Sequence, residues 1–304
     1  MRSCDIDHDE SPWIATDRHL GSIAIAAHNE ADRIGQLLNV LDAVARRGIV
    51  VAIVTNGCTD ATPVLVAQHP TIVHADRAVA SKTAALNHAD SLLGMNFPRL
   101  YLDADVSIDA DGIASLLNAA RGEGARLVAP IGVEDRSHSS WLVRRHGAFV
   151  DALPATRRYR AAYLSGRGVY GMSLDGRARF DQFPDVINED HFVNLQFSEA
   201  ERITVCDVTA RFPAPRDVRA LVRREVRVTS GRRQFTSPET KPPSAPLKSW
   251  IGGIRRVIHR ARRDPWWANL SLPEGLIDAV VYAGIWLVIT ARRHQGRAGA
   301  VPWR

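Results

Sequence analysis

The most constraining feature of the sequence is a regular alternation of apolar runs with helical patterns between residues 22 and 130. The first two runs are IAIAA at 23–27 and IVVAIVT at 49–55, and a helical pattern at about 31–47 separates them. Continuous apolar runs are typical of strands that are buried on both faces of a parallel sheet, with helices as the crossovers. The region therefore predicts an open α/β sheet, whose ligands bind at the carboxyl ends of its strands.

The same alternation extends beyond the first βαβ unit. Further helices are predicted near 61–68, 82–93, 109–121, 189–200 and 217–235, and further strands at 71–75, 99–103, 126–130, 169–174 and 203–208. Residues 134–167 are less regular and contain Arg-rich segments that favour helix. After residue 235 the Pro/Ser-rich stretch SPETKPPSAP predicts an extended linker. We expect a flexible tail at 1–20, a folded α/β domain at 21–235, a linker at 236–249 and a basic, apolar helical tail at 250–304.

Charge divides the chain at about residue 210. Residues 1–210 carry a formal net charge of −7 and residues 211–304 carry +13, within a total of +6. A basic surface of this kind suits nucleic acid, anionic lipid or a phosphorylated substrate. Because no RNA-binding aromatic motif, zinc-ligand spacing or helix-turn-helix pattern accompanies the charge, we expect no nucleic-acid partner.

The C-terminal tail combines arginines and tryptophans with an apolar stretch at 276–291. This stretch contains Asp278 and, at 16 residues, is shorter than the roughly 20 needed to span a bilayer. A short span, a helix lying on an anionic membrane and a helix packed on the protein all remain open. The N-terminus lacks the apolar run of a signal peptide, so we expect a cytoplasmic protein, with peripheral attachment to the inner face of the membrane as an option.

Polar residues follow three of the predicted strands. His28 and Glu30 follow the first strand, Asn56 ends the second, and Asp103 and Asp105 end the strand at 99–103. Each feature alone is explained by the capping of the next helix. Two carboxylates one residue apart at a strand end also suit a divalent cation that shares its ligands with a diphosphate.

The order and spacing of the polar segments favour a ligand site over helix capping alone. The segments AAHNE at 26–30, TNGCTD at 55–60, SKTAALN at 81–87, DAD at 103–105 and NED at 188–190 together resemble the family 2 glycosyltransferases of the GT-A fold. The resemblance covers about residues 22–235. It implies a Rossmann-like open mixed sheet with helices on both faces, to which the basic helical tail is added. It also implies an inverting enzyme that uses a nucleotide-diphosphate sugar and Mg²⁺ or Mn²⁺.

The resemblance also implies roles for individual residues. The nucleotide-sugar contacts carried over are Ala27, His28, Glu30, Asn56, Lys82, Asp103, Ala104, Gly168 and Arg227. The metal ligands carried over are Asp105, Asp103 and His191. Asp190 is the expected general base and Glu189 its rival, because the acceptor hydroxyl must lose a proton opposite the leaving diphosphate.

The sequence departs from the family pattern at the nucleotide end. His28 stands where the family usually has Tyr, Thr55 and Asn56 replace the usual Asp-Asp pair, and Ser81 replaces a Gly. Asn56 carries both a donor and an acceptor, so the identity of the nucleobase stays open. The expected acceptor is a lipid-linked or cell-envelope glycan.

Two other classes of function fit parts of the sequence. A sugar-phosphate nucleotidyltransferase shares the α/β architecture, but it usually has a glycine-rich loop after the first strand, and here no glycine precedes Gly35 in that loop. A non-catalytic membrane or nucleic-acid binding module would suit the basic tail. Such a module would have no need of Asp103, Asp105 and Asp190, so the enzyme is the favoured interpretation.

Overall fold

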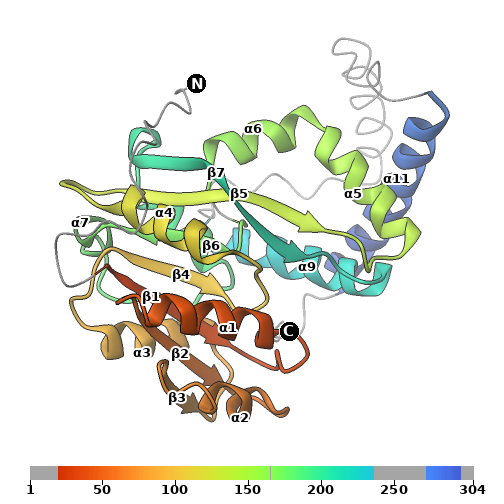
Figure 1. The fold of residues 1–304 in the computed structure, drawn as a ribbon. Helices are drawn as coiled ribbons and strands as arrows, with labels where there is room; N and C mark the ends of the chain where they lie inside the picture. The colour runs from red at the N-terminus through yellow and green to blue at the C-terminus, as the bar shows by residue number, and fades with distance from the viewer. Residues whose placement is uncertain (1–19, 165, 236–271, 296–304) are drawn as a thin grey trace. The chain divides into compact units, whose positions relative to one another are not determined.

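A computed structural model describes residues 20–164, 166–235 and 272–295 (Figure 1). These residues belong to two compact units. The first comprises residues up to Asp135 together with Tyr163–Pro213, and the second comprises Arg136–Ala162 and the chain from Ala214 onward. The predicted N-terminal tail, apart from residue 20, the linker and the first part of the predicted C-terminal tail lie outside the described residues.

The first unit is built on a seven-stranded sheet of order β3-β2-β1-β4-β6-β5-β7 (Figure 1). Its strands are β1 (Ser22–Ala27), β2 (Val50–Asn56), β3 (Val73–Arg77), β4 (Arg99–Asp103), β5 (Leu127–Asp135), β6 (Val169–Met172) and β7 (Arg202–Pro213). Strand β6 runs antiparallel to both neighbours, whereas the other pairs are parallel. The predicted open mixed α/β sheet is confirmed.

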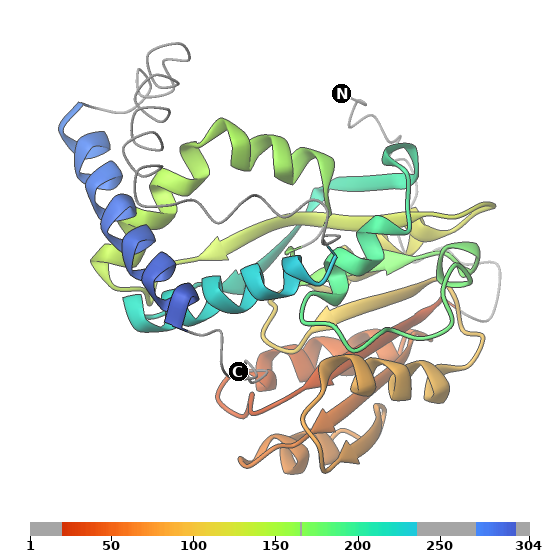
Figure 2. The same cartoon turned by 180° about the vertical axis from the view of Figure 1, so that it is seen from behind.

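Helices cover both faces of this sheet (Figures 1 and 2). They are α1 (Ile34–Ala45), α2 (Thr62–Ala67), α3 (Lys82–Leu93), α4 (Ala110–Ala120), α7 (Leu174–Arg177) and α8 (Glu189–Leu195), with a 3₁₀ turn at Glu199–Glu201. Successive residues of β1 alternate between two apolar cores. Ile23 and Ile25 pack in the core shared with α1 and α4, and Ala24 and Ala26 pack in the core shared with α3 and α8. Small residues on the α3 face let that helix lie close to β1.

Two strands are longer and one helix is shorter than the sequence pattern predicts. Strands β5 and β7 pair in parallel along their length, with a register shift after Pro130. The distal half of β5 is exposed or half-buried, and that of β7 alternates between exposed residues and the buried Val208 and Ala210, so neither half has the continuous apolar run that marks a strand buried on both faces. Helix α8 ends at Leu195, and Ser198 and Glu201 form a capping box on the turn that follows.

The second unit consists of helices α5 (Trp141–Ala152), α6 (Pro154–Ala162), α9 (Val218–Arg233) and α11 (Leu272–Gln295). Helices α5, α9 and α11 share a small apolar core that contains Val143, Leu221 and Ile285. Asp278 is buried in α11 and pairs with Arg145 of α5 at 2.8 Å. No helix in the described ranges combines the length and apolar character needed to cross a membrane.

Candidate active site

The polar residues singled out in the sequence gather at one edge of the sheet in the first unit. Strands β1, β2 and β4 are parallel neighbours, so their carboxyl ends lie side by side, with Ala27 opposite Thr55 and Ala26 opposite Asp103. Strand β6 runs the other way and brings its start to the same edge, where the Gly168 carbonyl accepts from the Asp103 N–H at 2.8 Å. Four chain segments therefore converge where ligands of open α/β sheets bind.

Three carboxylates from two of these segments form an acidic cluster. Burial, with the negative charges of Asp105 and Asp103, raises the pKa of Glu30 from 4.5 to about 7, although Arg33 opposes the shift. Burial and the charge of Asp103 likewise raise the pKa of Asp105 above its ordinary value. Because the charge of Asp103 raises the pKa of both Glu30 and Asp105, and that of Asp105 raises the pKa of Glu30 further, the cluster is a site where added positive charge is favourable.

Lys82 supplies part of that positive charge. Its Nζ lies 2.6 Å from Asp103 Oδ1 and 2.5 Å from Glu189 Oε1. Both contacts raise the pKa of Lys82, which therefore stays protonated. Lys82 is the first residue of α3, Asp103 ends β4, and Glu189 begins α8, so one ammonium group joins three elements.

Glu189 and Asp190 occupy different environments, although they are adjacent. The Glu189 residue is only 3% exposed, and burial and the charge of Asp190 raise the pKa of Glu189 to about 7 against the effect of Lys82. Asp190 is half-buried, and its two carboxylate oxygens accept from the N–H groups of Gly166 at 2.5 Å and His191 at 2.7 Å. Glu189 is thus committed to Lys82, whereas Asp190 keeps an accessible side.

Gly168 is required beside the acidic cluster for steric reasons. Its φ of +72° is a conformation that favours glycine, and a Cβ there would lie 2.5 Å from Val106 Cγ2 and 3.7 Å from Asp103 Oδ2. Strand β6 therefore approaches the end of β4 closely at Gly168. The predicted contact of Gly168 with the donor sugar stays a prediction.

Asn56 is held in place by its side-chain amide, and its contact with a nucleobase stays a prediction. Its side chain is fully buried. The amide nitrogen donates to the Ala27 carbonyl at 2.9 Å, and the amide oxygen accepts from the Ser81 N–H at 3.0 Å. Asn56 therefore ties the ends of β1 and β2 to the start of α3, and it offers no exposed surface to a nucleobase. His28 also turns inward, with Nδ1 2.6 Å from the Asn56 carbonyl oxygen.

The other sequence-predicted residues are placed as follows. Ala27 and Ala104 are buried, and the Ala27 carbonyl accepts from the Asn56 amide, so their contact with a donor stays a prediction. His191 is half-buried, with its ring 5.8 Å from that of Tyr163. Arg227 lies on α9, in the second unit, and its role stays a prediction.

The described residues contain no group of three or more His, Cys, Asp or Glu side chains placed to hold a metal ion. Asp103, Asp105 and His191 therefore do not form a complete ligand set. Two carboxylates are still sufficient for Mg²⁺ or Mn²⁺ in a site where diphosphate and water complete the coordination. The acidic cluster fits that arrangement, because its members repel one another and a cation would relieve the repulsion.

Two residues of this region were missed by the sequence reasoning. Arg33, just before α1, opposes the rise that burial causes in the pKa of both Glu30 and Asp105. Asn87, on α3, bonds to the backbone that leads to α8. Arg33 follows Glu30 by three residues, a spacing that could have suggested a charge partner. Asn87 ends the segment SKTAALN, which carries part of the family resemblance, but the motif did not indicate its contact with Phe183, 96 residues further along the chain.

Comparison with solved structures identifies the fold. The chain resembles the mannosyltransferase PcManGT from Pyrobaculum calidifontis, solved with GDP-Man and Mn²⁺, with a TM-score of 0.55 and 18% identity over 95% of this chain and 78% of that one. Glucosyl-3-phosphoglycerate synthase from Mycobacterium tuberculosis gives a TM-score of 0.49 and 16% identity, over 69% and 77% of the two chains. TarS 1–349 from S. aureus gives 0.48 and 13%, over 64% and 58%. No protein-family model and no curated protein matches the sequence. The fold is the GT-A fold expected from the sequence.

Proposed function

We propose that the protein is a metal-dependent, inverting glycosyltransferase that moves a sugar from a nucleotide-diphosphate sugar to an acceptor hydroxyl. One observation carries the proposal: the acidic cluster of Glu30, Asp103 and Asp105 meets the Lys82–Glu189–Asp190 group at the ligand-binding edge of a GT-A sheet. A cation site and a separate accessible carboxylate are the two parts that sugar transfer from a diphosphate requires.

Donor binding is assigned to the acidic side of this site. Asp105 would hold Mg²⁺ or Mn²⁺. Asp103 would share this role, although its Oδ1 also forms an ion pair with Lys82. When bound, the ion supplies positive charge that stabilises the diphosphate as it leaves. Lys82 is fixed by two carboxylates and adds a permanent charge beside them, and Gly168 keeps the backbone of β6 close to the same point. The chain thus orients the diphosphate before the bond to the sugar breaks.

Proton removal is assigned to Asp190. Its carboxylate is oriented by the N–H groups of Gly166 and His191, and it remains accessible. It would accept the proton of the acceptor hydroxyl as that oxygen attacks the sugar carbon from the side opposite the diphosphate, which inverts the anomeric centre. Glu189 holds Lys82 instead, which assigns different roles to the two adjacent acids.

Variant assays against a panel of nucleotide sugars with Mn²⁺ test the function. Asp190→Asn lowers kcat by about 100-fold or more, and Asp105→Ala abolishes the stabilisation by Mn²⁺ and nucleoside diphosphate. Asp111→Asn is the matched control, because Asp111 is an exposed carboxylate on α4 with a side chain that is 76% exposed. Wild-type turnover in both Asp190→Asn and Asp105→Ala would remove the assignment.

The nucleobase is best identified without knowledge of the acceptor. PcManGT was solved with GDP-Man, and the buried amide of Asn56 leaves no evident partner for a base at that position. Thermal stabilisation by GDP compared with UDP, each with and without Mn²⁺, measures the preference directly. Stronger stabilisation by GDP with Mn²⁺ would assign a guanosine donor, stronger stabilisation by UDP with Mn²⁺ a uridine donor, and no stabilisation by either would count against both as donor nucleotides.

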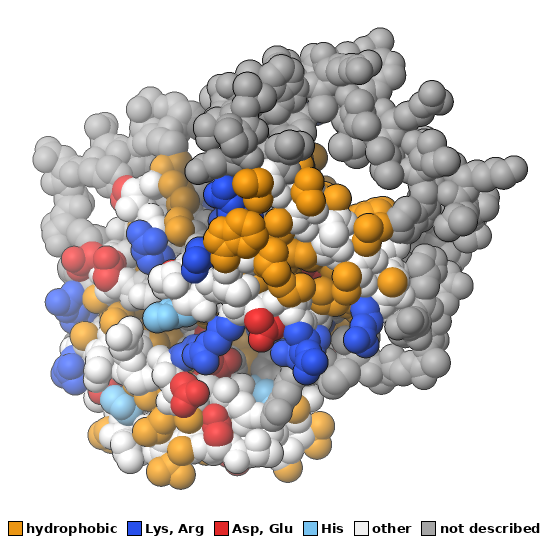
Figure 3. Space-filling view, turned by 90° about the vertical axis from the view of Figure 1, so that its right-hand side faces the viewer, with side chains coloured by type: hydrophobic (Ala, Val, Ile, Leu, Met, Phe, Trp, Pro, Cys, Tyr) orange, Lys and Arg blue, Asp and Glu red, His pale blue; other side chains and the backbone are white. Residues whose placement is uncertain are grey.

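The acceptor is proposed to be a lipid-linked or cell-envelope glycan met at the inner face of an anionic membrane. Helix α11 carries exposed apolar side chains at Ile277, Val280, Leu287 and Val288, and Trp286 is exposed beside them. Figure 3 shows hydrophobic side chains gathered on one face of the molecule, with Lys and Arg side chains beside them. Helix α9, which contacts α11, is rich in arginine. An apolar face with basic neighbours suits the surface of an anionic bilayer.

Sedimentation with liposomes tests this attachment. We expect binding to vesicles with anionic lipid at low salt and release at high salt. Val280→Glu weakens the binding, whereas Val64→Glu on α2 does not, although the two valines are similarly exposed, at 64% and 62%. Equal sedimentation of the two variants would exclude α11 as the membrane contact.

A further inference from the structure

The position of the proposed base depends on a segment without regular structure. Residues 178–188 connect α7 to α8 without helix or strand, and α8 opens with Glu189 and Asp190. Helix α8 is only seven residues long, so it has little rigidity of its own. Val193 in the core and Asn194, which accepts from the Leu164 N–H, fix the later part of α8, so contacts of the connecting segment fix the end of α8 that carries the two carboxylates.

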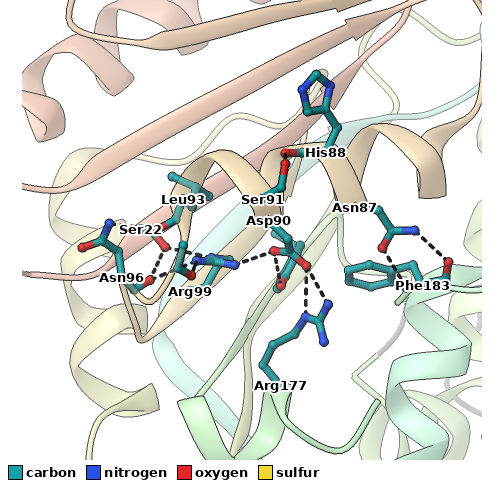
Figure 4. Close-up of polar contacts among 12 residues, drawn as sticks. Ser22, Asn87, His88, Asp90, Ser91, Leu93, Asn96, Arg99, Arg177 and Phe183 are labelled. Atoms are coloured by element: carbon teal, nitrogen blue, oxygen red, sulfur yellow. Dashed lines mark hydrogen bonds and ion pairs between the residues drawn. The ribbon is translucent and has the colours of Figure 1, made fainter. Parts of the chain in front are cut away.

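Asn87 of α3 forms hydrogen bonds with this segment at Phe183 (Figure 4). Its Nδ2 donates to the Phe183 carbonyl at 3.0 Å, and its Oδ1 accepts from the Phe183 N–H at 2.8 Å. One side-chain amide thus satisfies both backbone groups of a single residue. This two-point contact fixes the orientation of the chain as well as its distance from α3.

Apolar packing cannot replace this contact. The Phe183 residue is 3% exposed, and its ring meets the edges of Tyr101 and Phe180, each with centroids 5.1 Å apart. Such packing holds the ring but leaves the buried backbone groups in need of polar partners. Asn87 supplies those partners and fixes the course of the chain that leaves Phe183.

The same helix holds the far end of the segment. Lys82, at the first turn of α3, binds Glu189 at 2.5 Å. Residues 184–188 therefore lie between two contacts with α3, one at Phe183 and one at Glu189. Since Asp190 follows directly, the two contacts fix the backbone from which its carboxylate reaches the Gly166 N–H.

We propose that Asn87 is a positioning residue for the base: it places Asp190 through the segment that begins at Phe183. The proposal rests on the proposed function, because it assigns Asp190 the role of base. Asn87 itself touches neither carboxylate in the described contacts. Its loss displaces Asp190 while the acidic cluster at the donor end stays in place.

A neighbouring network provides a comparison for a structural role. Asp90, one turn further along α3, binds Arg99 at 2.6 Å, the Tyr101 hydroxyl at 2.8 Å and Arg177 at 2.9 Å (Figure 4). This network ties α3 to β4 and α7. Arg177 also donates to the Phe180 and Asp181 carbonyls at the start of the segment, so loss of this network loosens β4, α7 and the start of the segment together, whereas Asn87 acts on the Phe183 backbone alone.

The test uses the full-length protein with Asn87→Ala and Asn87→Asp, and with Ser91→Ala as the control. Ser91 is on the same helix, and its hydroxyl bonds only to the His88 carbonyl in the described contacts. Asn87→Asp keeps the acceptor for the Phe183 N–H and loses the donor, so it should lie between Asn87→Ala and wild type. Thermal midpoints define a temperature at which every variant is folded.

Two readouts then separate positioning from a general loss of structure. Asn87→Ala lowers kcat by about tenfold or more, since small displacements of a reacting group are costly, and leaves the donor KM and the Mn²⁺ and nucleotide stabilisation within about twofold. Hydrogen exchange quickens at residues 183–190 and not in β1 or β4. Ser91→Ala changes neither readout.

The results distinguish the two proposals. If wild type transfers no sugar from any donor, the proposed function fails, and the exchange pattern alone decides whether Asn87 fixes the segment. Unchanged exchange at 183–190, unchanged kcat, or a parallel loss of donor affinity in Asn87→Ala would each overturn the positioning role.

Discussion

Replacing Glu30 by glutamine tests the electrostatics of the acidic cluster directly. In the folded protein the pKa of Glu30 is raised from 4.5 to about 7, first by burial and then by Asp105 and Asp103. The folded state therefore keeps a proton that the unfolded chain has released between about pH 4.5 and 7. Because the unfolded chain binds fewer protons in this window, the free energy of unfolding falls as the pH rises through it.

The magnitude follows from the size of this shift. At about 1.4 kcal/mol per pH unit, the full difference would be about 3.4 kcal/mol. The Glu30 side chain is partly exposed, so solvent screening reduces the effect to about 1–2 kcal/mol. Glu30→Gln should therefore be about 1–2 kcal/mol more stable than wild type at pH 7.5 in the absence of divalent cations, and should lose less stability between pH 5 and pH 7.5.

Urea unfolding at pH 5.0 and pH 7.5, in a chelator and at constant ionic strength, measures both quantities. Glu123→Gln is the control, because it removes an exposed carboxylate outside the cluster and should follow the wild-type pH dependence. Burial raises the pKa of Asp105 and Glu189 as well, so some slope remains in Glu30→Gln. A Glu30→Gln slope that parallels wild type, or lower stability at pH 7.5, would refute the reasoning.

Three further outcomes follow from the same structure. Mn²⁺ should raise the thermal midpoint more at pH 7.5 than at pH 5.5, because protons compete for the raised-pKa carboxylates; an equal rise at both pH values would contradict this. Asp90→Asn should cost about 3–5 kcal/mol in urea unfolding, because Arg99 is 1% exposed and loses its charge partner; a loss below about 1 kcal/mol would show that water replaces it. Gly168→Ala should cost about 1–3 kcal/mol through its positive φ and the clash with Val106, seen as a lower thermal midpoint; a wild-type midpoint would show that the backbone adapts.

Local sequence signals predicted the sheet because its strands are apolar on both faces. The bounds of α3 and β4 match the predicted ranges at 82–93 and 99–103, since a Ser N-cap and a buried apolar run mark them. The distal half of β5 carries no such mark, and that of β7 has only the alternation of the buried Val208 and Ala210 with exposed residues. The parallel pairing of β5 with β7, a long-range contact, extends both strands beyond their apolar runs.

The candidate site likewise has some features that the sequence predicts and others that it does not. The strand-end position of Asp103 and Asp105 follows from the sequence, because a parallel sheet brings such ends together. The burial of Asn56 does not, because it depends on Ser81 arriving from another segment. The contact of Lys82 with Glu189 spans more than a hundred residues, and it gives the two adjacent acids different environments that no local spacing reveals.

The reversed direction of β6 has a consequence for how such a site can diversify. The loops after β1, β2 and β4 leave the sheet at the proposed donor end, whereas the loop that carries Gly166 and Gly168 arrives there before β6 begins. An insertion in this incoming loop leaves the register of the parallel strands unchanged. Changes of loop length before Gly166 therefore act on the N–H group that holds the Asp190 carboxylate, while the ends of β1, β2 and β4 stay in place.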